Sequence, residues 1–273
     1  MTAQSAQIRR EFEHCVSLVR SGNYAEAQPL LERTDFLERF PLAKRIREFV
    51  RFRLAGTSLA TVTHLGETAT FRVSDRNLGM DIFHAAGEFF EIEELEYCRQ
   101  RVSPGGVIVD VGANVGNHSV FFGRFLKPSR LIPVEPNSEA LPFLMENLTL
   151  NDIDTDERGF GIALGRASGQ GGITSDKGDL VESRMASGTG IPVVALDTLV
   201  EGPVHFLKID VEGMEFEVLR GAQQIIARSR PHILIEVADA KADALKQACA
   251  DLNYRIDREF EGYRYRNYFL SPV

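Results

Sequence analysis

The sequence predicts an α/β fold with a mostly parallel, seven-stranded sheet that ends in an antiparallel C-terminal hairpin. Three observations predict it. From Val107 onwards, short apolar segments alternate with segments of helical periodicity, as in parallel strands joined by crossover helices. The strand 107–109 is apolar and β-branched throughout, which is typical of burial on both faces. The segments 254–260 and 268–272, joined through Gly262, have the pattern of a hairpin.

Residues 1–60 predict a helical extension that precedes a main domain at 61–273. In the first helix apolar residues recur at helical spacing, at Phe12, Val16 and Val19. Further helical segments are expected at 24–33 and 36–54. One segment resembles a single helical repeat, but no second copy is found, so we expect a lone helical hairpin. These helices could form the contacts of a homodimer.

The remaining elements follow from the alternation of patterns along the chain. A short hairpin is expected around Gly66, formed by 61–63 and 70–73. Helices are expected at 91–101, 119–127, 141–150, 214–228 and 241–252. Further strands are expected at 131–134, 159–164, 204–209 and 232–237. The segment 168–190 is rich in Gly and Ser and predicts a loop or an irregular hairpin.

Composition and charge limit the class of protein. The 273 residues are 44% hydrophobic and 26% charged, as in an ordinary globular protein. A net charge of −8 argues against non-specific electrostatic binding to nucleic acid or to an anionic membrane. The three cysteines are far apart and contain no CxxC pair, which favours reduced thiols. No secretory signal and no apolar run of about 18 residues is visible, so we expect a cytoplasmic protein.

The main chemical signal is the turn that follows the strand 107–109. Asp110 ends the strand, and the chain then passes through Gly112, Asn114 and Gly116 into a helix. Glycine permits a tight turn and lets a ligand approach the backbone. The start of the helix offers unpaired N–H groups to an anion. In a site for S-adenosylmethionine (SAM) that anion would be the methionyl carboxylate, and Asp110 would help to hold the ammonium.

Two other interpretations of this turn are weighed against it. A dinucleotide fold expects the spacing G-x-G-x-x-G, but Asn114 stands where the middle glycine would let pyrophosphate approach. The turn could also join strand and helix without any ligand. The next strand, 131–134, ends in Glu135, and an acid at that point can accept both ribose hydroxyls of a nucleoside. Both NAD and SAM enzymes use this device.

A third strand delivers more acids to the same edge. The run HFLKIDVEG places Asp210 and Glu212 after the strand 204–209, where ligands bind in open α/β sheets. These acids could act as a base, attract a cation or stabilise the next helix. Glu212 and Glu236 could join Asp210 around Mg²⁺. No established metal-ligand spacing is found, so we assign no residue as a metal ligand.

These segments together resemble the FkbM family of SAM-dependent methyltransferases. The matching text is VDVGANVGNHS, VEPN, LKIDVEGMEFEVLRGA and RPHILIEV, with GEFFE before the first strand. The resemblance runs from about Gly87 to Val237 and does not cover residues 1–60. It implies the Rossmann-like fold of class I SAM methyltransferases, SAM as cofactor, and a hydroxyl of a sugar or secondary metabolite as the acceptor. His118 departs from the family, which tends to have an aromatic or apolar residue there.

The resemblance and the strand ends together give the predicted site. The predicted cofactor-binding residues are Glu91, Asp110, Gly112, Asn114, Gly116, Glu135, Pro136, Asn137 and Asp210. Asp210 is the first choice of general base for deprotonating the acceptor hydroxyl, and His118 and His84 are second choices. We expect a small hydroxylated acceptor and no nucleic acid or membrane partner. A scaffold that binds SAM without catalysis and an RNA methyltransferase are the alternatives.

Overall fold

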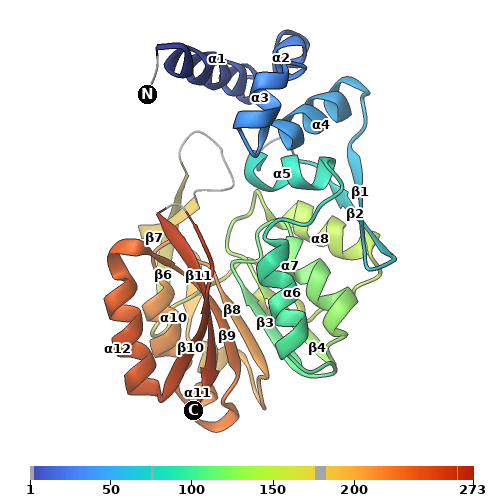
Figure 1. Ribbon diagram of the computed structural model, residues 1–273. Helices are drawn as coiled ribbons and strands as arrows, with labels where there is room; N and C mark the ends of the chain where they lie inside the picture. Colours follow the sequence, from blue (N-terminus) through green and yellow to red (C-terminus); the bar gives the residue numbers. More distant parts are fainter. Residues whose placement is uncertain (1–2, 75–76, 176–182, 263) are drawn as a thin grey trace. The chain divides into compact units, whose positions relative to one another are not determined.

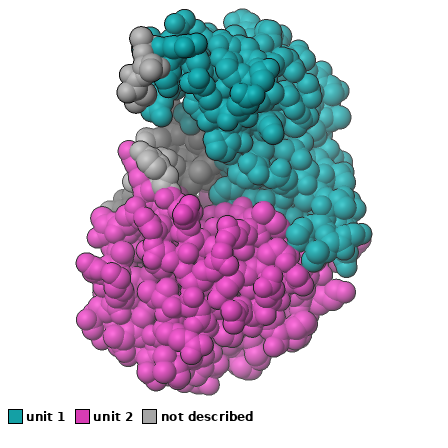
Figure 2. Space-filling view, viewed as in Figure 1, with its two compact units in different colours: residues 1–90 teal, residues 91–273 magenta. Residues whose placement is uncertain are grey.

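The computed structural model describes residues 3–74, 77–175, 183–262 and 264–273 (Figure 1). Contacts divide the chain into two compact units, residues 1–90 and residues 91–273 (Figure 2). This division lies further along the chain than the predicted boundary after residue 60. The predicted boundary between a helical extension and a main domain stays a prediction. Among the described residues, none of the helices combines the length and the apolar character that a membrane crossing requires.

The first unit is a helical body with a short hairpin. Its elements are α1 (Ala3–Arg20), α2 (Tyr24–Leu31), α3 (Thr34–Arg39), α4 (Ala43–Leu54), β1 (Leu59–His64), β2 (Glu67–Arg72) and α5 (Leu78–Ala85). The predicted lone helical hairpin is therefore wrong. The predicted helix at 36–54 is interrupted at Pro41, because the residue before proline avoids helical conformations. Phe40 accordingly has φ −119° and ψ 111°, and α3 ends there.

The hairpin of this unit is formed as the sequence predicts. Strands β1 and β2 pair antiparallel, and His64 is opposite Glu67 across the turn. The two turn residues, Leu65 and Gly66, both have positive φ, of 49° and 81°. This backbone matches the twist of paired strands and is the usual two-residue hairpin connection. His84, a second-choice base, lies in this unit, buried and stacked on Phe71 at 3.9 Å between ring centroids.

The second unit contains the predicted alternation of strands and helices. Its first elements are α6 (Ile92–Arg101), β3 (Val107–Val111), α7 (Asn117–Phe121), a π-helical turn (Phe122–Leu126), β4 (Arg130–Val134), α8 (Leu141–Leu150), β5 (Ala163–Leu164), β6 (Gly169–Ser175) and β7 (Ser183–Val194). The rest are α9 (Leu196–Leu199), β8 (Phe206–Ile209), α10 (Glu215–Gly221), α11 (Gln223–Ser229), β9 (His232–Ala238), α12 (Ala242–Leu252), β10 (Tyr254–Glu259) and β11 (Tyr265–Pro272).

The main sheet has six strands within the described residues, in the order β10-β11-β9-β8-β3-β4. Strands β9, β8, β3 and β4 are parallel, while β10 and β11 form the predicted antiparallel end. The α/β class is therefore confirmed, but the count of seven strands is wrong. The predicted strand at 159–164 reaches the sheet only through a bridge between Glu135 and Phe160. Gly161, with φ +74°, then turns the chain away, and β5 pairs with β7 instead.

Helices cover both faces of the main sheet in the second unit. Figure 1 shows α10, α11 and α12 on one side of the strands and α6, α7 and α8 on the other. Alternate strand residues such as Val109, Ile209 and Ile235 are buried in one apolar cluster with helix residues such as Val218 and Ile225. Burying these side chains removes a large apolar area from water. Because side chains alternate along a strand, this burial also fixes which face each residue at a strand end occupies.

Two further predictions fall in this unit. The predicted single helix at 214–228 is wrong, because α10 and α11 are separate and Ala222 between them has φ −113° and ψ 10°. A side chain at Gly221 would place its Cβ 2.0 Å from the carbonyl oxygen of Gly165, so α10 packs directly on the backbone that follows β5. The segment 168–190 forms the antiparallel pair β6 and β7, and its residues 176–182 lie outside the described residues.

Candidate functional site

The carboxyl ends of three parallel strands bring polar side chains onto one face of the sheet. Asp110 on β3 is in register with Lys208 on β8. Ile209 on β8 is in register with Ile235 on β9, so Asp210 and Glu236, the next residues along, share the opposite face. Glu236 is in turn in register with Asn267 on β11. A row of polar residues therefore crosses the same edge of the sheet that the sequence predicts as the ligand-binding edge.

The turn after β3 explains why its residues are Gly, Asn and Gly. Gly112, Asn114 and Gly116 all have positive φ, of 79°, 50° and 94°. Glycine adopts this region without strain, and asparagine tolerates it better than other residues. Asn114 can therefore take the place of the middle glycine of a dinucleotide fingerprint and still form a tight turn. At Gly116 a Cβ would lie 2.9 Å from Leu144 Cδ1, so the turn packs closely on α8.

Gly112 is held against the end of β8, and its substitution gives a stability prediction. A Cβ at Gly112 would lie 1.7 Å from the carbonyl oxygen of Asp210. We expect Gly112→Ala to lower the free energy of unfolding by about 3 kcal/mol or more, measured in urea, because backbone must move as well as φ. Gly202 is the matched control: its φ is +83° and nothing lies within 4 Å of its Cβ position. Gly202→Ala should cost only about 1 kcal/mol. Equal losses in the two variants would contradict the close contact.

Glu135 is fixed beside this turn by backbone donors. Its Oε2 accepts the N–H of Asn114 and its Oε1 accepts the N–H of Asn137, each at 2.7 Å. The carboxyl group is 6% exposed. Burial raises the pKa of Glu135 to about 7, although the two N–H groups act in the opposite direction. Each oxygen keeps a second lone pair, so the group can still accept the two hydroxyls of a ribose.

Asp110 is fully buried, and its carboxylate contacts other residues of this protein. Its Oδ2 accepts the hydroxyl of Ser119 at 2.6 Å, and its Oδ1 lies 3.4 Å from Lys208 Nζ. The same ammonium lies 3.4 Å from Asp210 Oδ2 and donates to the Gly112 carbonyl at 2.9 Å. Lys208 therefore connects the first predicted cofactor residues to the predicted base.

Glu91 and His118, which the sequence assigns to different roles, form one pair. Glu91 precedes α6 with φ +56°. Its Oε2 lies 3.1 Å from His118 Nε2, and its Oε1 accepts an N–H from Asn267 Nδ2 at 2.8 Å. Burial raises the pKa of Glu91, but the contact with His118, the charge of Lys208 and the Asn267 bond outweigh it and lower the pKa. His118 is 2% exposed and also contacts Asn117 and Phe122, so its ion-pair partner is Glu91 rather than Asp210.

Asp210 also belongs to a group of three carboxylates near the ends of β8 and β9. Within the described part of the chain, Asp210, Glu212 and Glu236 offer oxygens that all lie within 4.8 Å of one another. Burial and the negative charge of Asp210 raise the pKa of Glu236 well above its usual value. Carboxylates this close can share a proton or a cation. Acidic groups commonly gather without an ion, so this cluster alone assigns no metal ligand.

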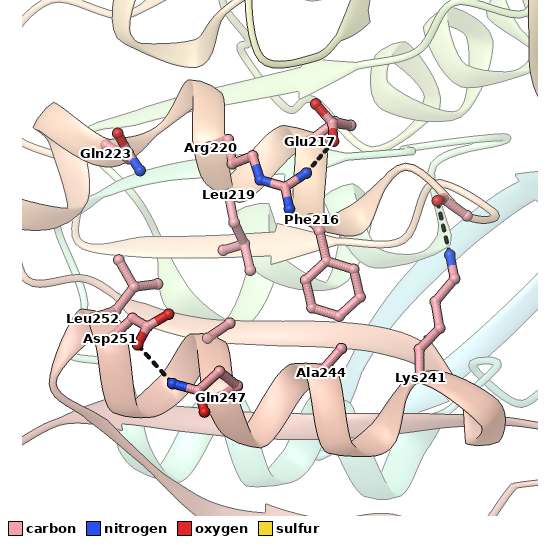
Figure 3. Close-up of a pocket in the computed structure, with 12 residues that line it drawn as sticks. Phe216, Glu217, Leu219, Arg220, Gln223, Lys241, Ala244, Gln247, Asp251 and Leu252 are labelled. Atoms are coloured by element: carbon pink, nitrogen blue, oxygen red, sulfur yellow. Dashed lines mark hydrogen bonds and ion pairs between the residues drawn. The ribbon is translucent and has the colours of Figure 1, made fainter.

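A separate pocket lies on the helical layer. It has a volume of about 520 Å³ and lies between α10, α11 and α12. Phe216, Leu219 and Ala244 lie along it, and Lys241 at one end donates to the Gly213 carbonyl at 3.0 Å (Figure 3). None of the predicted site residues lines this pocket. The chemistry that the sequence predicts therefore concerns the strand ends, and the pocket lies outside it.

Sequence reasoning missed two residues of this site, Lys208 and Asn267. A lysine inside an apolar strand was a usable signal, because a buried ammonium must be paired. Its partners could not be named in advance, since Gly112 is 96 residues away. Asn267 carried no signal in a strand expected only from residue 268 onwards. Pro136 follows Glu135 directly, and the predicted role of each residue in binding a cofactor stays a prediction.

Comparisons with known proteins give the family. The model of the Methyltransferase FkbM domain matches residues 110–266. A solved structure of methyltransferase FkbM from Methylobacillus flagellatus KT is 16% identical, with a TM-score of 0.48, and the match covers 93% of this chain and 60% of that one. The chain thus spans 60% of the length of that solved protein. Among curated proteins, none matches this chain.

Two further solved structures have similar scores. An rRNA methylase from Streptococcus thermophilus is 12% identical, with a TM-score of 0.44, and the match covers 66% of this chain and 95% of that one. TYW2 from M. jannaschii, solved in complex with AdoMet, is 14% identical, with a TM-score of 0.44 and coverage of 80% and 88%. The family model, which spans more than half of the chain, confirms the resemblance drawn from the motifs. This protein belongs to the FkbM methyltransferase family.

Proposed function

We propose that this protein transfers a methyl group from SAM to a hydroxyl oxygen of a small hydroxylated acceptor, such as a sugar or a secondary metabolite. The observation that carries the proposal is that the ends of β4 and β8 both lie against the glycine turn that follows β3, the strand between them. Glu135 is oriented by Asn114 and Asn137 beside this turn, and Asp210 follows β8 with its backbone against Gly112. The candidate nucleoside anchor and the candidate base therefore lie on one edge of the sheet.

The residues of the turn fit the cofactor that the family implies. Glu135 offers acceptor oxygens suited to ribose hydroxyls. At Gly112 and Gly116 the absence of side chains lets the turn pack closely against the Asp210 carbonyl and against Leu144, which fixes its backbone. The surrounding carboxylates of Glu91, Asp110 and Asp210 suit a ligand that carries an ammonium and a sulfonium. SAM, when bound, supplies a methyl group already activated for displacement.

The protein must then align the acceptor and remove its proton. An alcohol is a weak nucleophile while it is protonated, so a base at the acceptor oxygen speeds the step. In this proposal a carboxylate oxygen of Asp210 accepts the hydroxyl proton as the acceptor oxygen bonds to the methyl carbon; the carbon–sulfur bond of the donor would break at the same time and S-adenosylhomocysteine would leave. Lys208, 3.4 Å from Asp210 Oδ2, holds that carboxylate in place. The side chain of Asp210 is 25% exposed, so in this proposal the bound acceptor itself displaces water from the base.

Methyl transfer from labelled SAM tests the proposal. The acceptors would be a panel of hydroxylated sugars and secondary metabolites, with total RNA as a separate arm. The expected result is label in a hydroxylated small molecule, in an ether that resists mild base. The net charge of −8 predicts little label in RNA. Label in RNA would replace the acceptor class with nucleic acid, and SAM binding without transfer to any acceptor would favour a scaffold.

A further inference from the structure

Lys208 is the buried cation at the centre of the polar row. It lies in β8 between Phe206–Leu207 and Ile209, all fully buried, and its own side chain is 4% exposed. Moving an ammonium out of water costs several kcal/mol unless partners replace the water. An apolar side chain would fit a central strand at a lower cost. The presence of a lysine here therefore needs an explanation beyond packing.

The partners of Lys208 belong to two different parts of the proposed site. Its Nζ donates to the Gly112 carbonyl at 2.9 Å and lies 3.4 Å from Asp110 Oδ1, both beside the cofactor turn. The same Nζ lies 3.4 Å from Asp210 Oδ2, on the acceptor side. An ammonium has three N–H donors and no acceptor. Lys208 uses them in one hydrogen bond, to the Gly112 carbonyl, and forms two ion pairs at 3.4 Å, with Asp110 and Asp210, so its partners lie on two strand ends.

The backbone joins the same two parts. The N–H of Asp210 donates to the carbonyl of Val111 at 3.0 Å. The carbonyl oxygen of Asp210 lies so close to Gly112 that a Cβ there would be at 1.7 Å. The turn and the end of β8 thus form one junction, and Lys208 closes it on the side-chain face. A shift of the Asp210 carboxylate would have to move Lys208, and with it the Gly112 carbonyl.

Burial and charge act on Lys208 in opposite directions. Burial lowers its pKa, but the carboxylates of Asp110, Asp210 and Glu91 outweigh burial and raise the pKa above its usual value. The side chain is therefore a cation at neutral pH. Without it, Asp110 and Asp210 would face each other across the junction with no counter-charge between them.

We propose that Lys208 is a positioning residue that couples the cofactor turn to Asp210, holding the Gly112 carbonyl and the two carboxylates at a fixed spacing. The importance of that spacing for methyl transfer rests on the proposed function. The coupling of Lys208 to Asp210 and Gly112 does not depend on it. A lysine that acted independently of Asp210 would affect donor binding and stability by amounts that simply add to those of an Asp210 substitution.

A double-mutant cycle read by binding of S-adenosylhomocysteine (SAH) separates these two roles. We would titrate SAH calorimetrically into the wild type, Lys208→Met, Asp210→Asn and the double variant. Lys208→Met should weaken binding at least tenfold, because the carbonyl and both carboxylates lose their shared partner. Asp210→Asn alone should weaken binding less than Lys208→Met does, because Lys208 keeps Asp110 and the Gly112 carbonyl as partners. In the double variant the repulsion is relieved, so it should bind SAH at least fivefold more tightly than Lys208→Met.

Controls keep the result specific. Lys246→Met removes an exposed lysine that is paired with Asp243, and it should leave the affinity for SAH unchanged. If Lys208→Met does not fold, Lys208→Gln, which keeps a neutral donor, replaces it in the same cycle. Independent effects of the two substitutions, adding within twofold, would overturn the coupling.

If the proposed function is wrong, the wild type itself will not bind SAH, which distinguishes this outcome from a failure of the coupling alone. The same four proteins would then be compared by urea unfolding, where the double variant should unfold at a higher urea concentration than Lys208→Met alone. Additive midpoints in urea would overturn the inference, whatever the cofactor of this protein is.

Discussion

Replacing Glu135 with alanine is expected to weaken SAH binding about 100-fold. Both carboxylate oxygens are oriented by backbone N–H groups, so the group is held ready for a ribose. Each hydrogen bond to a charged group contributes about 1.5 kcal/mol or more, and two such bonds correspond to about two orders of magnitude in affinity. Calorimetric titration measures the change. Glu201→Ala, which removes an exposed carboxylate in a loop, is the matched control and should have no effect.

The same carboxyl group predicts a pH dependence. Burial raises the pKa of Glu135 to about 7. Its ionised form accepts hydroxyl donors more strongly than its protonated form, so binding should tighten as the pH rises through that value and weaken as it falls. Between about pH 6 and pH 8 the affinity for SAH should rise about tenfold, since one protonation controls it. Glu135→Gln stays neutral and should bind more weakly with no pH dependence in this range. A wild-type affinity that does not change with pH would contradict an anchoring role for Glu135.

Replacing Asp210 with asparagine is expected to lower kcat about 100- to 1,000-fold while the protein still binds SAH. A general base contributes about 10² to 10⁴ in rate, and asparagine keeps the size of the side chain but cannot take a proton. The measurement is methyl transfer from SAM to the acceptor found by the panel, together with an SAH titration. Asp243→Asn, at a side chain that is 96% exposed, is the control and should transfer at the wild-type rate.

Two other outcomes are informative for Asp210. Unchanged turnover in Asp210→Asn with intact SAH binding would remove Asp210 as the base. His118 would not be its natural replacement, because its ring is buried and lies 3.1 Å from Glu91. Glu212 and Glu236, whose oxygens are near those of Asp210, would be the next residues to substitute.

Local signals in the sequence gave the parts of the fold that depend on neighbouring residues. The helix at 141–150 is observed with the predicted bounds, with Pro142 in its first turn, where proline is favoured. The hairpin around Gly66 is observed, and glycine accepts without strain the positive φ of 81° that the turn requires there. The prediction of a main-sheet strand at 159–164 is wrong for a reason that the local sequence pattern does not contain. Its apolar residues suit a strand, but Gly161 turns the chain and β5 finds a partner in β7.

The candidate site shows the same division. The turn and the acids at the ends of β3, β4 and β8 could be predicted, because parallel strands end at one edge of a sheet. The partners of these acids could not. Lys208 and Gly112 meet only because β8 lies beside β3, and Asn267 reaches Glu91 from a strand 176 residues further along the chain. Such pairings depend on strand order, which the spacing of motifs does not reveal.

We propose that the strand ends around Glu135 and Gly112 hold the nucleoside of SAM. Calorimetric titration of wild-type protein with SAH, and with NADH as a control ligand, tests this most directly. We expect one SAH site per chain and no binding of NADH, because Asn114 replaces the glycine that a pyrophosphate needs. Binding of NADH, or of neither ligand, would contradict it and return the turn to a dinucleotide site or to a purely structural role.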